Sequence, residues 1–119
     1  MLQKENRLKQ KYAFNATYKI KNFHHKGGIT VHVGKISDKN IPVKIGFVVS
    51  KKTHKRAVKR NRLKRLMRES VRLILKEDNS LNKYMSLVFT GHTSALGKNF
   101  YEIDKSIRFL IKEISKYDD

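Results

Sequence analysis

The chain has 119 residues, enough for one domain, and its 28 Lys and Arg against 10 Asp and Glu give a net charge of +18. Because such a charge repels itself in a compact fold, it favours a polyanionic partner, with nucleic acid ahead of an anionic membrane surface. The composition excludes disulfides and cysteine-ligated zinc, since there is no cysteine, and no apolar run approaches the roughly 20 residues of a membrane helix. The first residues lack the apolar core of a secretory signal, so a cytoplasmic location is expected.

Hydrophobic periodicity predicts the elements in chain order. They are a helix over 6–21, a loop over 24–28, a strand over 29–35, a turn over 38–42, a strand over 44–50, a helix over 54–76, a strand over 84–90 and a helix over 99–117. In the first helix, Leu8, Tyr12, Ala16 and Ile20 recur every four residues and are predicted to be its buried stripe. The order predicts an α+β sandwich, a small sheet with helices packed on it.

Residues 57–75 predict an amphipathic helix with two opposed faces. The apolar arc holds Leu63, Leu66, Met67, Ser70, Leu73 and Ile74. The opposite face holds Asn61, Lys64, Arg68 and Arg72, flanked by Arg60 and Arg65. Arginine's planar fork suits phosphate oxygens, and an asparagine can both donate and accept hydrogen bonds at a base edge or a 2′-hydroxyl. This face is therefore predicted to bind nucleic acid rather than to be merely solvated, and Glu69 is expected to pair with Arg65 and Arg72.

Two aromatic residues of the first helix, Phe14 and Tyr18, are i,i+4 neighbours that lie off the predicted buried stripe. They are candidates to stack on unpaired bases, which contributes roughly 1–3 kcal/mol per base. The alternative is that the helix is sandwiched and both of its faces are buried. In the next strand, Thr30 and His32 share the face opposite the aliphatic residues and are candidates for the floor of the same cleft.

The acidic and histidine residues do not form a catalytic pattern. Acidic residues are adjacent only at 77–78 and 118–119, both at predicted element ends, whereas a metallonuclease needs clustered carboxylates to hold Mg²⁺. The five histidines show no spacing typical of a metal site or an acid–base pair, and Gly27-Gly28 indicates a turn rather than a phosphate loop. The chain is therefore predicted to contribute no catalytic residue and no metal ligand.

The segment from the second strand into the basic helix resembles a known signature. Its residues are Lys51-Lys52, Arg56-Ala57, the RNRLKR run at 60–65 and Arg68-Glu69-Ser70. Together they resemble the bacterial ribonuclease P protein component. Arg7-Leu8 followed by Phe14 and Tyr18, the GFVVSKK stretch at 46–52 and the closing amphipathic helix add to the likeness, which covers essentially the whole chain.

The resemblance implies a single domain over residues 1–119, of element order αβββαβα. It implies a two-layer α+β sandwich related to ribosomal protein S5 domain 2, with a left-handed β-α-β crossover against the usual right-handed rule. It also implies a subunit of a ribonucleoprotein endoribonuclease that removes the 5′ leader of precursor tRNA, the catalyst being the RNA subunit with its Mg²⁺. The partners expected are that RNA subunit and precursor tRNA, with no membrane and no small-molecule substrate.

Site residues follow from the resemblance by position. The RNA-binding set is Lys51, Lys52, Arg56, Arg60, Asn61, Arg62, Lys64, Arg65 and Arg68, to which the helical wheel adds Arg72. Phe14, Tyr18 and His32 would line the cleft for the leader, with His32 at a strand position that is often aromatic in relatives. The segment Thr90-Gly91-His92 lacks a basic residue that many relatives place there.

Three other classes fit the composition less well. A ribosomal or RNA-chaperone-type binding protein would share the fold and charge without a role in processing. A helix-turn-helix DNA binder needs a short helix before its recognition helix, whereas the strand GFVV precedes residue 51. A cationic membrane-active protein comes last.

Overall fold

The computed structural model describes residues 2–36, 41–77 and 80–116. Its helices and strands are α1 (Lys11–Lys19), β1 (Phe23–Lys26), β2 (Ile29–Val33), β3 (Lys44–Val48), α2 (Ala57–Glu77), β4 (Ser86–Gly91) and α3 (Phe100–Lys116). Three short 3₁₀ turns, η1 (Lys4–Asn6), η2 (Ser80–Lys83) and η3 (Thr93–Ala95), connect them. The order αβββαβα is the one that the family resemblance implies. The predicted turn over 38–42 falls mostly outside the described residues.

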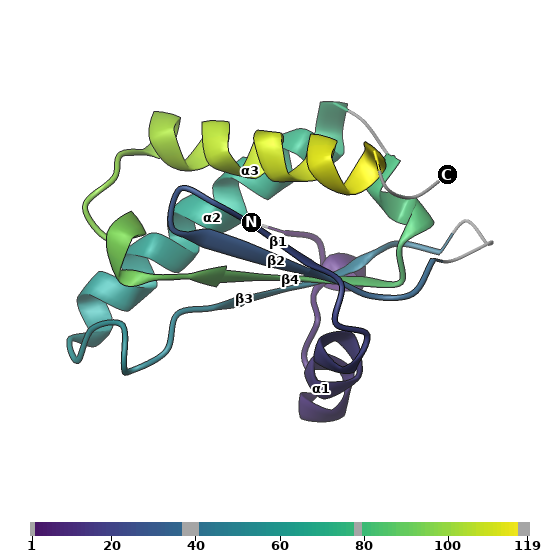
Figure 1. The fold of residues 1–119 in the computed structure, drawn as a ribbon, viewed down its shortest axis with the longest axis horizontal. Coiled ribbons are helices and arrows are strands. Elements are labelled where there is room, and N and C mark those ends of the chain that lie inside the picture. Colours follow the sequence, from purple (N-terminus) through teal and green to yellow (C-terminus); the bar gives the residue numbers. More distant parts are fainter. Residues whose placement is uncertain (1, 37–40, 78–79, 117–119) are drawn as a thin grey trace.

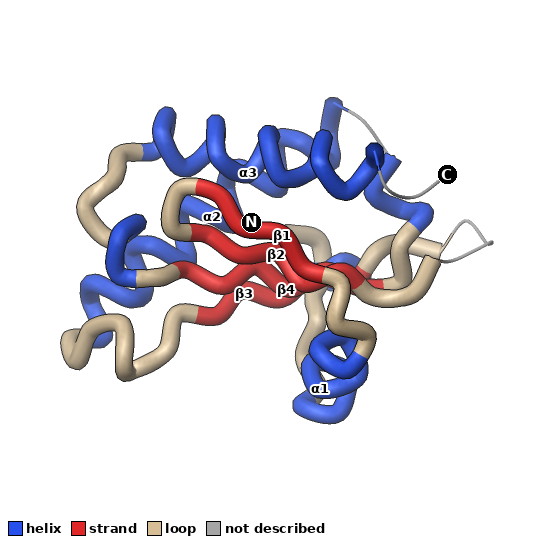
Figure 2. The backbone as a smooth tube through the Cα atoms, in the orientation of Figure 1, coloured by secondary structure: helices blue, strands red, loops and turns tan. Residues whose placement is uncertain are grey.

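The four strands form one sheet in the order β1-β2-β4-β3. β2 pairs with β1 and β4 in antiparallel fashion, whereas β3 runs parallel to β4 and reaches it through α2. The long helices α2 and α3 lie together against one face of the sheet, and the short helix α1 lies against the other face at one end (Figures 1 and 2). The α+β sandwich is confirmed, and the handedness of the crossover stays a prediction.

The core lies between the sheet and the α2–α3 layer. Leu63 and Met67 of α2, Ile107 of α3 and Leu87 and Phe89 of β4 are fully buried there. At the α2–α3 contact, the buried Ser70 hydroxyl donates to Asp104 Oδ1 at 2.7 Å. Asp104 in turn accepts a hydrogen bond from Arg108 Nε at 2.9 Å, and Arg108 also pairs with Glu77 at the end of α2. This series of hydrogen bonds and ion pairs joins α2 to α3.

Residues 7–10 are not helical and α1 ends at Lys19, so the predicted helix over 6–21 is too long at both ends. Residues 7 and 8 instead run beside the outer edge of β3, where Leu8 N–H donates to the carbonyl of Ile45 at 2.9 Å. Asn6 Nδ2 donates to the carbonyl of Val43, also at 2.9 Å. These bonds occupy an edge that would otherwise expose unpaired backbone groups.

The predicted buried stripe of α1 is also wrong. Tyr12 is 73% exposed and Ile20 38% exposed, and Ala16 is exposed as well. The helix buries Thr17, whose hydroxyl lies 2.6 Å from that of Ser86 in β4. Leu8 is outside the helix, in the extended segment. The face of α1 that packs on the sheet is the one that carries Phe14, Thr17 and Tyr18.

Strand β1 falls in the region predicted as a loop. It forms a hairpin with β2 across Gly27 and Gly28, whose φ values are +61° and +83°. Two consecutive residues with positive φ are the requirement of a type I′ hairpin turn, which glycine meets without strain. The hairpin adds one more row of side chains to the face on which α1 lies.

Candidate nucleic-acid interface

Helix α2 presents the two faces that its sequence predicts. On the inner side Leu63, Met67, Ser70, Val71 and Ile74 are buried. On the outer side Asn61, Arg65 and Arg68 are exposed, and Lys64 is half-buried. A hollow of about 680 Å³ follows this surface, lined by Val58, Lys59, Asn61, Arg62, Arg65, Arg68 and Glu69. No ion pair joins Lys64, Arg65 or Arg68 to a carboxylate within the described residues, so their charges stay available to a ligand.

Two arginines of the motif are engaged with the protein's own backbone. Arg60 Nη1 donates to the carbonyls of His54 and Lys55, at 2.7 and 2.9 Å, and so ties the entering loop to the first turn of α2. Arg62 donates from Nη1 to the carbonyl of Leu96 and from Nη2 to that of Lys98, at 3.1 and 3.2 Å. These two guanidinium groups therefore join α2 to neighbouring loops, and only their remaining N–H groups are left for a ligand.

Arg72 is the cation of this face that a carboxylate neutralises. Its Nε lies 3.1 Å from Glu69 Oε2, in an i,i+3 pair that is partly open to solvent. The hydrogen bond from Arg72 lowers the pKa of the Glu69 carboxyl, and the same bond raises the pKa of Arg72. The predicted pairing of Glu69 with Arg72 is confirmed. Glu69 makes no hydrogen bond to Arg65 in the part of the chain that is described, so that half of the prediction is wrong.

The basic residues that lead into α2 lie on an exposed loop. Lys51, Lys52 and Arg56 are all exposed, and a hydrogen bond from Thr53 N–H to the carbonyl of Ser50 shapes the turn between them. The Arg56 N–H donates to His54 Nδ1 at 3.0 Å. The loop therefore extends the cationic surface of α2 beyond its first turn.

The three predicted cleft residues lie on the other face of the sheet, where Tyr18 and His32 are in contact. The Tyr18 ring stands edge-on to the His32 ring, with centroids 4.8 Å apart, and His32 lies 5.6 Å from the ring of Phe23. Phe14 packs against β3 at Gly46, where a side-chain Cβ would lie 2.5 Å from Phe14 Cζ. Phe14 and Tyr18 are thus half-buried at the seam between α1 and the sheet.

The environment of this cleft shifts two titrations. Burial raises the pKa of the Tyr18 hydroxyl, and a hydrogen bond with Thr90 partly opposes that rise. Burial lowers the pKa of His32, and the neighbouring His92 lowers it further. His32 is therefore a mainly neutral ring at neutral pH, suited to stacking.

The sequence predictions miss several residues that complete this cleft. The exposed Phe23 and the imidazoles of His25 and His92 share the face of His32 and Thr30, since Phe23 pairs with His32 and His25 with Thr30 across the hairpin. The signal was present: a Gly-Gly pair flanked by FHHK and ITVHV is typical of a hairpin.

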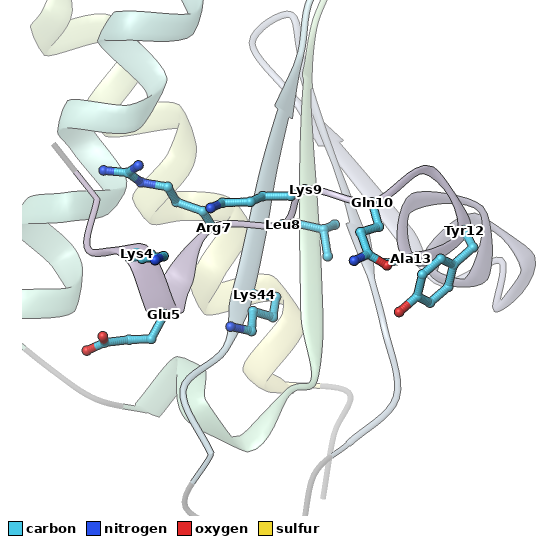
Figure 3. Close-up of a pocket in the computed structure, with 9 residues that line it drawn as sticks. All are labelled: Lys4, Glu5, Arg7, Leu8, Lys9, Gln10, Tyr12, Ala13 and Lys44. Carbon is cyan, nitrogen blue, oxygen red and sulfur yellow. The ribbon is translucent and has the colours of Figure 1, made fainter.

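A second cationic hollow lies at the β3 edge and also escapes the sequence predictions. It measures about 540 Å³ and has Lys4, Arg7, Lys9 and Lys44 among its lining residues, with the exposed ring of Tyr12 on α1 (Figure 3). A neighbouring cavity of about 300 Å³ is lined both by Phe14 and by Arg68, whose Cζ lies 6.0 Å from the Phe47 ring centroid. The α2 surface and the α1 cleft are therefore connected around this edge.

The described residues bring no three His, Asp or Glu side chains into an arrangement that would hold a metal ion. None of the described helices is long and apolar enough to cross a membrane.

Comparison with known proteins supports one family. The model of the ribonuclease P family matches residues 2–115. The ribonuclease P protein component of Clostridium kluyveri is 35% identical over 114 residues, covering 93% of this chain and 96% of that protein. That of Clostridioides difficile is 34% identical, with 88% of each chain covered. The structure of the Staphylococcus aureus RNase P protein superposes with a TM-score of 0.75 at 24% identity, covering 93% of this chain and 96% of that one.

Proposed function

Because the chain belongs to the ribonuclease P protein family, and so is a protein subunit of the tRNA-processing ribonuclease P, we propose that its two surfaces bind different RNAs. The outer face of α2 with its leading loop binds the RNA subunit of the enzyme. The cleft between α1 and the sheet binds the single-stranded 5′ leader of precursor tRNA.

The assignment of α2 is carried by one observation: the outer face presents unpaired cations beside a single amide. Lys64, Arg65 and Arg68 have no carboxylate partner among the described residues, and the one acid nearby, Glu69, is held by Arg72. Arginine forks grip phosphate oxygens in pairs, and the exposed Asn61 supplies a neutral donor and acceptor between them. Such a face suits a folded RNA, whose backbone offers phosphates and 2′-hydroxyls.

The assignment of the cleft depends on its rings. Tyr18, His32 and Phe23 form a row of partly exposed rings on which unpaired bases can stack. Stacking is tolerant of sequence, as binding to many different leaders would require. The cationic hollow at the β3 edge, with Lys9 and Lys44, adds attraction for the backbone of the same strand.

Catalysis is assigned to the RNA subunit and its Mg²⁺, and no residue of this chain is assigned to the reaction. Three of the acids that the structure describes are held by arginines. Glu77 and Asp104 bind Arg108, and Glu69 binds Arg72. The protein's role is to raise the affinity of the holoenzyme for precursor tRNA and to reduce the Mg²⁺ that it needs.

The test is reconstitution. The protein is mixed with its cognate RNA subunit, and cleavage of a leader-bearing precursor tRNA is followed across a Mg²⁺ titration. We expect the protein to move the Mg²⁺ dependence to lower concentration. A variant with Lys64, Arg65 and Arg68 changed to Ala should lose this effect. A control that also removes three positive charges, Lys105→Ala with Lys112→Ala and Lys116→Ala on α3, should keep it. Absence of stimulation at every Mg²⁺ concentration would overturn the proposal, and equal stimulation of unrelated RNA refolding would indicate a general RNA chaperone.

A further inference from the structure

Two imidazoles on the α1 face of the sheet are joined through one hydroxyl. Thr30 Oγ1 lies 2.9 Å from His25 Nδ1 and 2.8 Å from His92 Nε2. The two rings are 5.6 Å apart. The three residues come from different parts of the chain, since His25 is in β1, Thr30 is in β2 and His92 directly follows β4. The sheet therefore assembles the group, and no local sequence pattern does.

The hydrogen bonds of this group are directional. A threonine hydroxyl has one proton to donate and two lone pairs. In the arrangement that uses its proton within the group, one neutral imidazole donates N–H to Thr30 and the other accepts from it. The ring that donates inward carries its lone pair on its outer nitrogen, and the ring that accepts carries an outer N–H. The two outer nitrogens are His25 Nε2 and His92 Nδ1, and neither has a hydrogen-bond partner within the described chain.

One added proton changes what the group offers without breaking it. The proton enters on the outer nitrogen of the ring that donates to Thr30, and the inward chain is kept. The group then presents two outward N–H donors and one positive charge. A second proton would place a positive charge on each of two rings whose centroids are 5.6 Å apart, and the repulsion between these like charges opposes it. Two N–H donors and one charge suit the two free oxygens of a phosphodiester.

The lysines near the hairpin lie on the other face of the sheet from this group. Lys98 Nζ donates to the carbonyl of Gly27 at 2.9 Å and Lys26 stands over the Phe109 ring, both on the α3 side. Positive charge at the group therefore comes from its own imidazoles. His32 of β2 is near enough to His92 for the pKa of His32 to be lowered by it, and no described carboxylate forms an ion pair with His25 or His92. Burial lowers the pKa of His92, and the neighbouring imidazole of His25 lowers it further, so the His92 ring is mainly neutral at neutral pH.

We propose that His25 and His92, bridged by Thr30, form a phosphate subsite that takes up one proton from solvent when a phosphodiester of single-stranded RNA occupies it. This inference rests on the proposed function of the cleft, because Thr30 is two residues from His32 on the same face of β2. It adds to that cleft a phosphate contact whose strength depends on pH. Holding of the leader therefore strengthens as the pH falls.

The first test is a histidine NMR titration of the protein alone, with inorganic phosphate, and with a six-nucleotide single-stranded RNA. We expect one titration of the His25–His92 pair to move upward by about one pH unit with the RNA, as a bound anion requires. His24, which alternates to the other face of β1, should not move. No movement of either ring would overturn the inference, and movement with phosphate but not with RNA would also overturn it, since the site would then bind only a small ion.

The second test measures affinity for leader-bearing precursor tRNA and for mature tRNA between pH 8 and 6. Uptake of one proton allows at most about tenfold tighter binding per pH unit, and we expect a three- to tenfold gain over the range for the precursor only. Thr30→Val should abolish the gain, Thr30→Ser should keep it, and His92→Lys should bind the precursor equally at both ends. A gain that persists in Thr30→Val would overturn the subsite. If precursor and mature tRNA bind equally at every pH, the proposed function of the cleft fails instead.

Discussion

The guanidinium of Arg62 spans from α2 to the carbonyls of Leu96 and Lys98, joining the basic helix to the loop that enters α3. A residue in the middle of the RNRLKR run thus binds two parts of the fold together. This relationship separates arginines that hold α2 in place from arginines that face a ligand.

Arg62→Ala should lower the free energy of unfolding by about 1.5–3 kcal/mol, the usual contribution of hydrogen bonds to a charged group. The substitution leaves two carbonyl groups without their donor. Urea unfolding followed by circular dichroism would measure the change. Arg65→Ala is the matched control, because Arg65 is exposed and should change stability by less than about 0.5 kcal/mol. Equal stability of both variants would mean that Arg62 is free in solution.

Arg65→Ala should instead change how RNA binding depends on salt. Loss of one phosphate contact reduces the slope of log affinity against log salt by roughly 0.7–0.9. Affinity for the RNA subunit, measured at several potassium concentrations, provides the slope. An unchanged slope would place Arg65 away from the RNA.

Glu69→Gln should strengthen RNA binding, since it releases Arg72 from its carboxylate and removes a negative charge from the α2 surface. The pair is open to solvent, so the substitution should change stability little. The same salt titration should show a slope steeper by up to about one unit. Weaker binding in Glu69→Gln would show that the carboxylate positions Arg72 for the RNA.

Gly46→Ala should push α1 away from the sheet. A methyl group at this position would meet the Phe14 ring, with Cζ only 2.5 Å away, and such overpacking costs about 1–3 kcal/mol. We expect lower stability together with weaker discrimination between precursor and mature tRNA. Gly97→Ala is the control, because nothing lies within 4 Å of its added Cβ. If Gly46→Ala binds the precursor as tightly as the original protein does, Phe14 does not line the cleft for the leader.

Stability should fall in mild acid because of His32 and His92. Both have a pKa lowered from the ordinary value of 6.5 in the folded protein, first by burial and then by a neighbouring imidazole. The unfolded chain therefore binds more protons as the pH falls below about 6.5. The free energy of unfolding should decrease from that pH downward until the lowered folded pKa is passed. Urea midpoints of His32→Gln should decline less than those of the original protein between pH 7 and 5, and parallel curves would contradict the prediction.

The features of α2 could be predicted because they are local. Leu63, Met67 and Ile74 define its buried side whatever they pack against, and the charged face follows. The destination of a long arginine is different. Arg62 lies near the border of the two faces on a helical wheel, and the carbonyls that it reaches are more than 30 residues away in sequence.

Helix α1 shows what periodicity leaves undetermined. Its sequence carries two stripes at four-residue spacing, one with Tyr12 and Ala16 and one with Phe14 and Tyr18, and both are apolar enough to be buried. The choice was made by partners outside the helix: Gly46 leaves room for the Phe14 ring, and Ser86 meets Thr17. Strand β1 was missed for a similar reason, since it is an edge strand whose side chains are mostly exposed.

The sheet order β1-β2-β4-β3 has a consequence for how the protein is made. The strand that leaves the ribosome last, β4, is the one that must insert between partners already synthesised. When α2 has emerged in full, the hairpin and β3 still share no hydrogen-bonded neighbour. Residues 78–91 take a further roughly 1–3 s at 5–20 residues per second. During that interval the residues of α2 have been synthesised, but the sheet on which the helix packs is still incomplete. A nascent chain that met RNA in this interval would bind it by charge alone, and the specific surface exists only after β4 closes the sheet.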